Sequence, residues 1–336
     1  MLGGEEVLKV LVTGGAGYIG SVLIGGLLDR GYSVICLDRL IFRDAGIKPY
    51  IGMSNFKLVV DDTRTFNSEI LNGVNAVVDL AAISQPDPSG YLEERLFHEM
   101  NYKGPVRVAN LSMKHGVKKY IFASTCSVYG FQEGLISEKS QPNPLENYAK
   151  TKLMVEEEVK PLSSKEFCVT ILRLATVYGL SRKMRFDLVV NGMTLSLYKT
   201  GVIKVMHPGT QIRPVVHVAD VAKAIISVIE ADESEVNGEV FNVGSNDQNY
   251  RIYDLAKLIG DSIGKPYKIE WYGEPDTRSY NVDFTKIRKR LNFIASYTPI
   301  QGSREVYKAL EEGVISDAPE TRVISWWKTL KAKEVV

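Results

Sequence analysis

Short apolar segments recur along the first half of the chain, and stretches with helical periodicity separate them. The apolar segments cover residues 7–13, 33–38, 56–62, 75–82, 118–125 and 167–174. Several are apolar on both faces, which is typical of strands buried inside a parallel sheet. The helical segments cover roughly residues 65–71, 91–115 and 146–160. Because strands alternate with helices, the sequence predicts an α/β fold: a Rossmann-type, doubly wound parallel sheet with right-handed crossovers.

The alternation loosens after residue 176. The next segments are a predicted helix at 186–201, a predicted strand at 211–218 and a predicted helix at 218–232. A chain of 336 residues is long for a single core, so a second lobe is expected. We therefore predict a Rossmann domain over 1–175 and a smaller mixed α/β lobe over 176–336, with 210–245 packing back on the first domain.

A glycine-rich turn, VTGGAGYIG, joins the first predicted strand to its helix, with Gly14, Gly17 and Gly20 in the spacing G-x-x-G-x-x-G. Glycine permits a tight turn and close approach of a pyrophosphate, and the helix N-terminus offers free N–H groups to the anion. Asp38 ends the second strand about 20 residues later, where a carboxylate can bind a ribose. These features predict dinucleotide binding. Asp38 would repel a 2′-phosphate and so favours NAD over NADP, whereas the neighbouring Arg39 could hold that phosphate.

Composition and charge argue against several functions. The net charge is +1, so no electrostatic argument favours nucleic acid or an anionic membrane surface. No apolar stretch reaches the length of about 20 residues that spans a bilayer. The N-terminus has no signal-peptide pattern. Cys36, Cys126 and Cys168 are too few and too scattered for a disulfide framework or a zinc cluster, and no other pattern suggests a metal site. We therefore expect a cytoplasmic protein without a metal.

The segment NYAKTKL places a phenol and an ammonium on one helical turn. Tyr148 and Lys152 are four residues apart and so share a helix face. A nearby ammonium and an oxidised nicotinamide both favour the phenolate, which brings the tyrosine closer to the pH at which a general base works. The segment FASTCSVYG places Thr125 at the end of the strand 118–125, where ligands bind in open α/β sheets. A Tyr-x-x-x-Lys pair alone also occurs on ordinary helix surfaces.

The motifs TGGAGYIG, FASTCSVYG, YAKTK, RLATVYG and IRPVVHVADVAKAI occur in this order, and together they resemble the extended short-chain dehydrogenase/reductase family. Within that family the chain resembles the NAD-dependent nucleotide-sugar epimerases and dehydratases, UDP-glucose 4-epimerase among them. The resemblance covers about residues 1–290. It implies that Tyr148 is the catalytic base, that Lys152 holds the nicotinamide ribose and that Thr125 completes the triad. It also implies that Asn101 supports the active-site helix.

The resemblance implies binding residues for NAD and for a nucleotide diphosphate sugar, which the second lobe would hold. The cofactor-binding residues are Gly14, Gly17, Tyr18, Ile19, Gly20, Asp38, Asp62, Thr63, Leu80, Ala81, Ala82, Tyr148 and Lys152. The substrate-binding residues are Thr125, Cys126, Asn191, Arg213 and Arg278. The planar guanidinium of Arg213 suits paired phosphate oxygens. Rim salt bridges for the arginines and a surface position for Asn191 are the alternatives.

Two departures from the family pattern narrow the reaction. Sugar 4,6-dehydratases carry Asp-Glu after the catalytic threonine, whereas this chain has Cys126 and Ser127. Thr176 in RLATVYG replaces an asparagine that many 4-epimerases carry. The leading hypothesis is a nucleotide-sugar epimerase that oxidises its substrate transiently to a 4-keto sugar. A 4-keto-sugar reductase or a dehydratase of the same family, and a catalytically silent NAD-binding protein, are the alternatives. Cys126 is either an acid–base group or a small buried residue.

Members of this family commonly form homodimers through a four-helix bundle. In this chain the helices would be 91–115 and 146–160, with Leu153 and Met154 among the apolar contacts. A two-fold contact of this kind is therefore expected. We predict a structural role for His217.

Overall fold

The computed structural model describes residues 7–84 and 94–333. The predictions for the extreme N-terminus and for the helix start at 91–93 lie outside the described residues. Among the described residues, no helix combines the length and the apolar character that a bilayer crossing needs.

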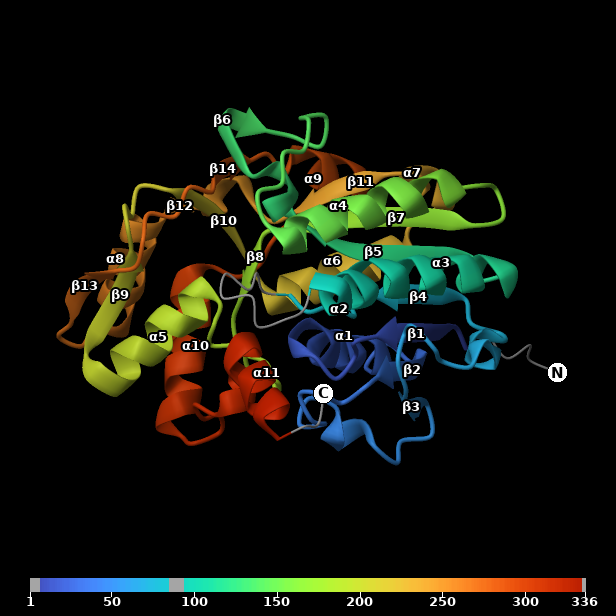
Figure 1. Cartoon of the computed structure of the whole chain (residues 1–336), viewed down its shortest axis with the longest axis horizontal. Coiled ribbons are helices and arrows are strands. Elements are labelled where there is room, and N and C mark those ends of the chain that lie inside the picture. The colour runs from blue at the N-terminus through green and yellow to red at the C-terminus, as the bar shows by residue number, and fades with distance from the viewer. Residues whose placement is uncertain (1–6, 85–93, 334–336) are drawn as a thin grey trace.

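A seven-stranded parallel sheet forms the centre of the first lobe, with strand order β11-β7-β5-β4-β1-β2-β3 (Figure 1). Its strands are β1 Lys9–Thr13, β2 Ser33–Asp38, β3 Phe56–Val60, β4 Ala76–Asp79, β5 Lys119–Thr125, β7 Cys168–Leu174 and β11 Val240–Val243. The predicted doubly wound parallel sheet is confirmed. Because β11 comes from the region 210–245, a late part of the chain completes the edge of this sheet.

The two faces of the sheet bury two separate hydrophobic cores, which explains why its strands are apolar at consecutive positions. In β1, Val10 and Val12 lie in one core, whereas Leu11 between them lies in the other. All three side chains are fully buried. A strand covered on both faces has no solvated side, so its sequence is continuous in apolar residues instead of alternating.

Helices cover both faces (Figure 1). One face carries α1 Tyr18–Leu28 and α6 Val218–Glu230, which pack on each other, and the other carries α3 Gly104–Lys114 and α4 Asn147–Val159. The helix predicted at 91–115 is observed from residue 94 as α2 Glu94–His98, a π-helical turn Glu99–Lys103 and α3. The helix predicted at 65–71 is only a short 3-10 helix, Ser68–Leu71. It starts where the Asn67 side chain accepts a hydrogen bond from the Glu69 N–H, a local bond that favours a turn.

The second lobe is smaller and contains both helices and strands, and Figure 1 shows it beside the carboxyl ends of the strands of the main sheet. Its strands are β8 Thr176–Tyr178, β9 Val202–Met206, β10 Ile212–His217, β12 Asn249–Arg251 and β13 Lys268–Tyr272; β6 Phe131–Ile136 pairs with β14 Ser279–Val282 nearby. Its helices are α5 Val189–Thr200, α8 Ile252–Ile263, α10 Pro299–Glu311 and α11 Val323–Ala332; α7 Glu233–Val236 and α9 Thr285–Leu291 lie near β11. The division into two lobes at residue 176 stays a prediction.

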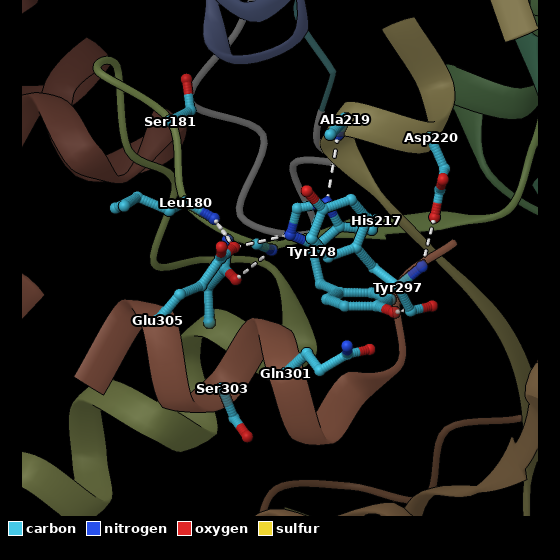
Figure 2. Close-up of polar contacts among 12 residues, drawn as sticks. Tyr178, Leu180, Ser181, His217, Ala219, Asp220, Tyr297, Gln301, Ser303 and Glu305 are labelled. Atoms are coloured by element: carbon cyan, nitrogen blue, oxygen red, sulfur yellow. Dashed lines mark hydrogen bonds and ion pairs between the residues drawn. The ribbon is translucent and has the colours of Figure 1, made fainter. Parts of the chain in front are cut away.

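A polar cluster around the buried His217 joins the end of β10 to α10 (Figure 2). His217 Nδ1 accepts a hydrogen bond from the Ala219 N–H, and its Nε2 lies 2.6 Å from Oε1 of Glu305. The same carboxylate oxygen accepts the Leu180 N–H at 2.6 Å, and the His217 ring stacks on Tyr297. Both ring nitrogens are therefore engaged by the protein, so His217 is a structural residue, as predicted. The cluster fixes the start of the loop that follows β8.

Candidate active site

Most of the predicted site residues line one cavity of about 860 Å³, where the parallel strands end and the second lobe begins. Asp38, Leu80 and Thr125 reach it from the carboxyl ends of β2, β4 and β5. Open α/β sheets bind ligands in this crevice. The cavity also contains side chains of the second lobe, Arg213 and Arg278 among them. One continuous space therefore joins the predicted cofactor residues to the predicted phosphate residues.

The glycine loop packs closely on its own backbone and on the turn after β4. Gly14 has φ +62°, and a Cβ there would lie 2.9 Å from the backbone of Ala81. A Cβ on Gly20 would lie 2.6 Å from the Gly14 carbonyl oxygen. Gly17 is the N-cap of α1 and has no side chain to cap it, so the first N–H groups of the helix stay available to a phosphate. The loop, with Tyr18 and Ile19 beside it on the cavity wall, fits NAD.

Two backbone N–H groups hold the Asp38 carboxylate at the cavity wall. The carboxylate accepts the Ala16 N–H at 3.0 Å and the Leu40 N–H at 2.8 Å, and burial raises the pKa of this carboxyl group. Arg39, which could have held a 2′-phosphate, instead forms an ion pair with Asp62 at 3.2 Å. The arrangement therefore favours NAD. Asp62, Thr63, Leu80, Ala81 and Ala82 line the same cavity.

Tyr148 and Lys152 lie in the first two turns of α4, and both line the cavity. Lys152 is buried, donates a hydrogen bond to the Ala123 carbonyl oxygen at 2.7 Å and lies 4.4 Å from the centre of the Phe122 ring. Burial lowers the pKa of Lys152 to about 8, although the carboxylates of Asp79 and Glu156 oppose this.

The electrostatics of Tyr148 correct one part of the sequence argument. Burial raises the pKa of Tyr148 to about 12, and the cation that counteracts this rise is Arg185. The expectation was that Lys152 would favour the phenolate. In the structure the Lys152 ammonium is directed to the carbonyl of β5, so Arg185 supplies the positive charge that acts on the phenol.

The turn after β5 separates Thr125 from Cys126. The Thr125 hydroxyl accepts the Ser127 N–H and donates to the Ser127 hydroxyl, and both residues line the cavity. Cys126 is fully buried, its thiol donates to the Arg173 carbonyl oxygen at 3.3 Å, and burial raises its pKa. The structure thus does not bring Cys126 to the cavity wall. Ser127, and not Cys126 as predicted, lines the cavity after Thr125.

The end of the cavity that was predicted to bind a diphosphate contains two arginines and two carboxylates. Arg213 and Arg278 each form an ion pair with Asp276, at 2.8 and 2.9 Å, and Arg278 also pairs with Glu146 at 2.9 Å. The guanidinium of Arg213 packs over the Tyr280 ring. Both arginines are thus oriented by carboxylates on the cavity wall. A diphosphate would find two fixed guanidinium groups there.

Asn191 does not reach the cavity. Its side chain is fully buried, its Oδ1 accepts the Gly179 N–H at 2.9 Å, and its Nδ2 donates to the Tyr18 hydroxyl and to the Arg185 carbonyl. The Tyr18 hydroxyl in turn donates to the Gly179 carbonyl at 2.7 Å. All these bonds are internal, so Asn191 positions the loop after β8. Its neighbour Gly192 lines the cavity in its place.

The sequence argument missed the loop 181–187. Arg185 is bound at 2.9 Å by both carboxylate oxygens of Asp187, donates to the Ser84 hydroxyl and lines the cavity. Lys183 also lines it, and burial lowers its pKa to about 8. The available signal was the cluster of basic residues in SRKMR, which starts two positions after the end of the RLATVYG motif. Among residues 7–84 and 94–333, no group of three or more possible metal ligands occurs.

Residues 10–244 match the family described as "NAD dependent epimerase/dehydratase family", which is well over half of the chain. The chain belongs to this family. The predicted membership of the extended short-chain dehydrogenase/reductases is confirmed, and NAD is the cofactor of the family. Among curated proteins, the chain is similar to UDP-glucose 4-epimerase of Bacillus subtilis, with 26% identity over 86% of this chain and 92% of that protein. A Bacillus subtilis protein named as an uncharacterized UDP-glucose epimerase is 28% identical over 85% and 92%.

Solved structures of epimerases have the same fold. UDP-glucuronic acid 4-epimerase from Bacillus cereus, in complex with UDP-glucuronic acid and NAD, superposes with a TM-score of 0.81 at 25% identity. The match covers 91% of this chain and 99% of that one. The fold of UDP-N-acetylglucosamine 4-epimerase from Methanobrevibacter ruminantium matches with a TM-score of 0.82 at 22% identity. The fold class and the enzyme class predicted from the sequence are thus confirmed.

Proposed function

We propose that this NAD-dependent enzyme is a nucleotide-sugar 4-epimerase. The observation that carries the proposal is the single cavity in which Thr125, Tyr148 and Lys152 lie at one end and Arg213 and Arg278 at the other. The first group is a proton-transfer site, and the second suits a diphosphate. The similar epimerases named above act on UDP-sugars, which supports a UDP-sugar as the substrate here.

In this proposal Tyr148 accepts the proton of the sugar 4-hydroxyl and later returns it to the 4-keto group. Bound NAD would accept the hydride in its oxidised form and return it in its reduced form, and the oxidised form would also place a positive charge beside the phenol. Arg185 assists Tyr148, because its charge lowers the phenol pKa. The Thr125 hydroxyl would turn its proton from Ser127 to the sugar oxygen when the substrate binds. The sugar must turn between the two hydride steps while Arg213 and Arg278 keep the diphosphate in place.

Lys152 is proposed to hold the nicotinamide ribose. Its ammonium is fixed by the Ala123 carbonyl, and its remaining donors are available to ribose hydroxyl groups. The glycine loop would hold the pyrophosphate, and Asp38 the adenosine ribose. The residues proposed to bind substrate are Thr125, Ser127, Arg185, Arg213 and Arg278.

A dehydratase is disfavoured because no carboxylates follow Thr125: Cys126 is buried and Ser127 is a neutral hydroxyl.

We also propose a homodimer formed through α3 and α4, supported by the exposed side chains of Met113 and Met154 on these helices. The three cysteines are free, which is compatible with the proposed cytoplasmic location.

The test is incubation of the purified protein with UDP-, GDP-, CDP- and dTDP-sugars in deuterated water without added cofactor, followed by NMR. The proposal requires conversion to the C4 epimer with no deuterium at carbon, because the hydride returns internally. Tyr148→Phe should lose this conversion. Turnover that appears only when NADH or NADPH is added would replace the proposal with a 4-keto-sugar reductase. Deuterium at C3 or C5 would indicate enolisation instead.

A further inference from the structure

The last described residues of the chain form one wall of the active-site cavity. We call residues 319–332, which comprise the 3-10 helix Pro319–Thr321 and α11, the C-terminal clasp. Four of its residues line the cavity: Glu320, Arg322, Val323 and Trp327. Ile41 and Phe42, in the loop that follows Asp38, line the cavity as well. Figure 1 shows α11 (red) close to the blue segments of the first lobe, although the two are far apart in sequence.

The clasp is fastened to the loop after β2 on the cofactor side. The Trp326 indole N–H donates to the Ile41 carbonyl oxygen at 2.6 Å. The Arg43 guanidinium lies 5.2 Å from the centre of the Trp326 ring and forms an ion pair with Glu320 at 3.3 Å. Ile41, which is held in this way, lies three residues after Asp38, the residue proposed to bind the adenosine ribose.

The clasp is fastened on its other side to the loop 181–187. The Phe186 N–H donates to the Thr321 carbonyl at 2.9 Å, and the Val323 N–H donates to Asp187 at 3.1 Å. The Lys183 ammonium donates to the Glu320 carbonyl, and it lies 5.1 Å from the centre of the Phe42 ring. The clasp therefore bridges the loop after β2 and the loop 181–187, which both line the cavity.

The inner side of the clasp packs beside the proposed catalytic base. Val323 and Trp327 form a hydrophobic cluster with Ile83 and Phe97, and Tyr148 packs against this cluster. Trp327 is 4% exposed. The cover thus extends from the loop after Asp38 to Tyr148, along the part of the cavity where the cofactor residues lie.

We propose that the C-terminal clasp is a further part of the cofactor site, that it keeps the dinucleotide in place, and that Trp327 covers the cofactor end of the cavity. The Trp326–Ile41 and Phe186–Thr321 hydrogen bonds hold the clasp over this part of the cavity, so their loss should speed the exchange of a bound dinucleotide. The inference rests on the proposed function in one respect: an epimerase must return hydride from the same cofactor molecule, so loss of NADH between the two steps would end its cycle.

The experiment measures exchange of bound NAD in the absence of any sugar. The full chain, loaded with NAD and freed of unbound cofactor, is mixed with excess isotopically labelled NAD, and the unlabelled fraction is followed by mass spectrometry. Three variants are compared: Trp327→Ala, which removes the cover; Trp326→Phe, which removes the indole donor to Ile41 but keeps an aromatic ring; and Trp271→Phe as a control. Trp271 is a half-exposed tryptophan of β13 that does not line the cavity.

We expect exchange in Trp327→Ala to be about 10-fold faster or more than in the unsubstituted protein, because truncation of a buried tryptophan at a contact is commonly this costly. Trp326→Phe should exchange several-fold faster, and Trp271→Phe should not differ. If Trp326→Phe and Trp327→Ala both fold and exchange NAD at the rate of the unsubstituted protein, the proposal that the clasp retains the cofactor is wrong. If Trp327→Ala does not fold, Trp326→Phe decides. Failure of the unsubstituted protein to epimerise any sugar would refute the proposed function alone, because the exchange assay contains no sugar.

Discussion

The buried ammonium of Lys152 should make the protein less stable at neutral pH than it would be without this charge. The side chain is 2% exposed, and the one hydrogen bond that the structure gives its ammonium is to the Ala123 carbonyl. Burial lowers its pKa from the ordinary value of 10.5 to about 8. The folded protein therefore holds this proton less tightly than the unfolded chain does. We propose Lys152→Met as the perturbation, with Lys150→Met, an exposed lysine on the same helix, as the matched control.

The sign and size of the effect follow from the two pKa values. Between pH 8 and pH 10.5 the unfolded chain binds more protons at this site than the folded chain, so the contribution of Lys152 to stability rises with pH. From pH 7 to pH 9.5 the unsubstituted protein should gain about 2 kcal/mol relative to Lys152→Met. Other groups titrate in the same range in both proteins, and the comparison removes their contribution.

The assay is urea denaturation of the unsubstituted protein and of both variants at pH 7, pH 8.5 and pH 9.5, with the free energy of unfolding compared at each pH. Lys150→Met should differ from the unsubstituted protein by a constant amount. Lys152→Met should lose activity while its unfolding free energy changes less with pH. A constant difference between Lys152→Met and the unsubstituted protein from pH 7 to pH 9.5 would refute the claim that burial lowers the pKa of this lysine.

Three further substitutions test the cavity and its support. Arg213→Met should raise KM for the nucleotide sugar about 10-fold or more in steady-state kinetics, because a guanidinium fixed for phosphate is lost, and an unchanged KM would contradict that role. Arg173→Met leaves Glu156 buried without its partner at 2.7 Å, so urea denaturation should show a loss of about 3–5 kcal/mol, and adding Glu156→Gln should recover part of it. Gly14→Ala should weaken NAD binding measured by calorimetry and cost about 1–3 kcal/mol of stability, whereas Gly31→Ala, also at positive φ but with no atom within 4 Å of the added Cβ, should leave NAD binding unchanged.

The sheet could be predicted from the sequence because a strand that is buried on both faces is a short run of consecutive apolar residues. The strand predicted at 33–38 is observed as Ser33–Asp38, and the strand predicted at 118–125 as Lys119–Thr125. The prediction of a helix at 65–71 was wrong in length, because the Asn67 side chain accepts the Glu69 N–H and favours a turn there. No pattern in the sequence indicated that α11 closes the cavity. Its contact from Trp326 to Ile41 joins residues 285 positions apart, which only the folded chain reveals.

For the predicted site residues, the sequence identified the segments that reach the cavity better than it identified which side chains of those segments face it. Thr125 and Ser127 face the cavity, whereas Cys126 between them faces Arg173. β5 ends at Thr125 and a 3-10 helix starts at Cys126, and the Thr125 hydroxyl accepts the Ser127 N–H across this turn. A motif identifies the segment that reaches the cavity. It does not identify which of two adjacent side chains does so.

The loop after β8 explains why two predicted ligand-binding side chains serve the site indirectly. The Tyr18 hydroxyl, from the cofactor helix, and the Asn191 amide, from α5, both bind the backbone of Gly179. These bonds fix the start of the segment that carries Lys183 and Arg185 into the cavity. Tyr18 and Asn191 thus influence the site through the position of Arg185, whose charge lowers the pKa of Tyr148, the proposed catalytic base. Their substitution should therefore alter proton transfer as well as binding.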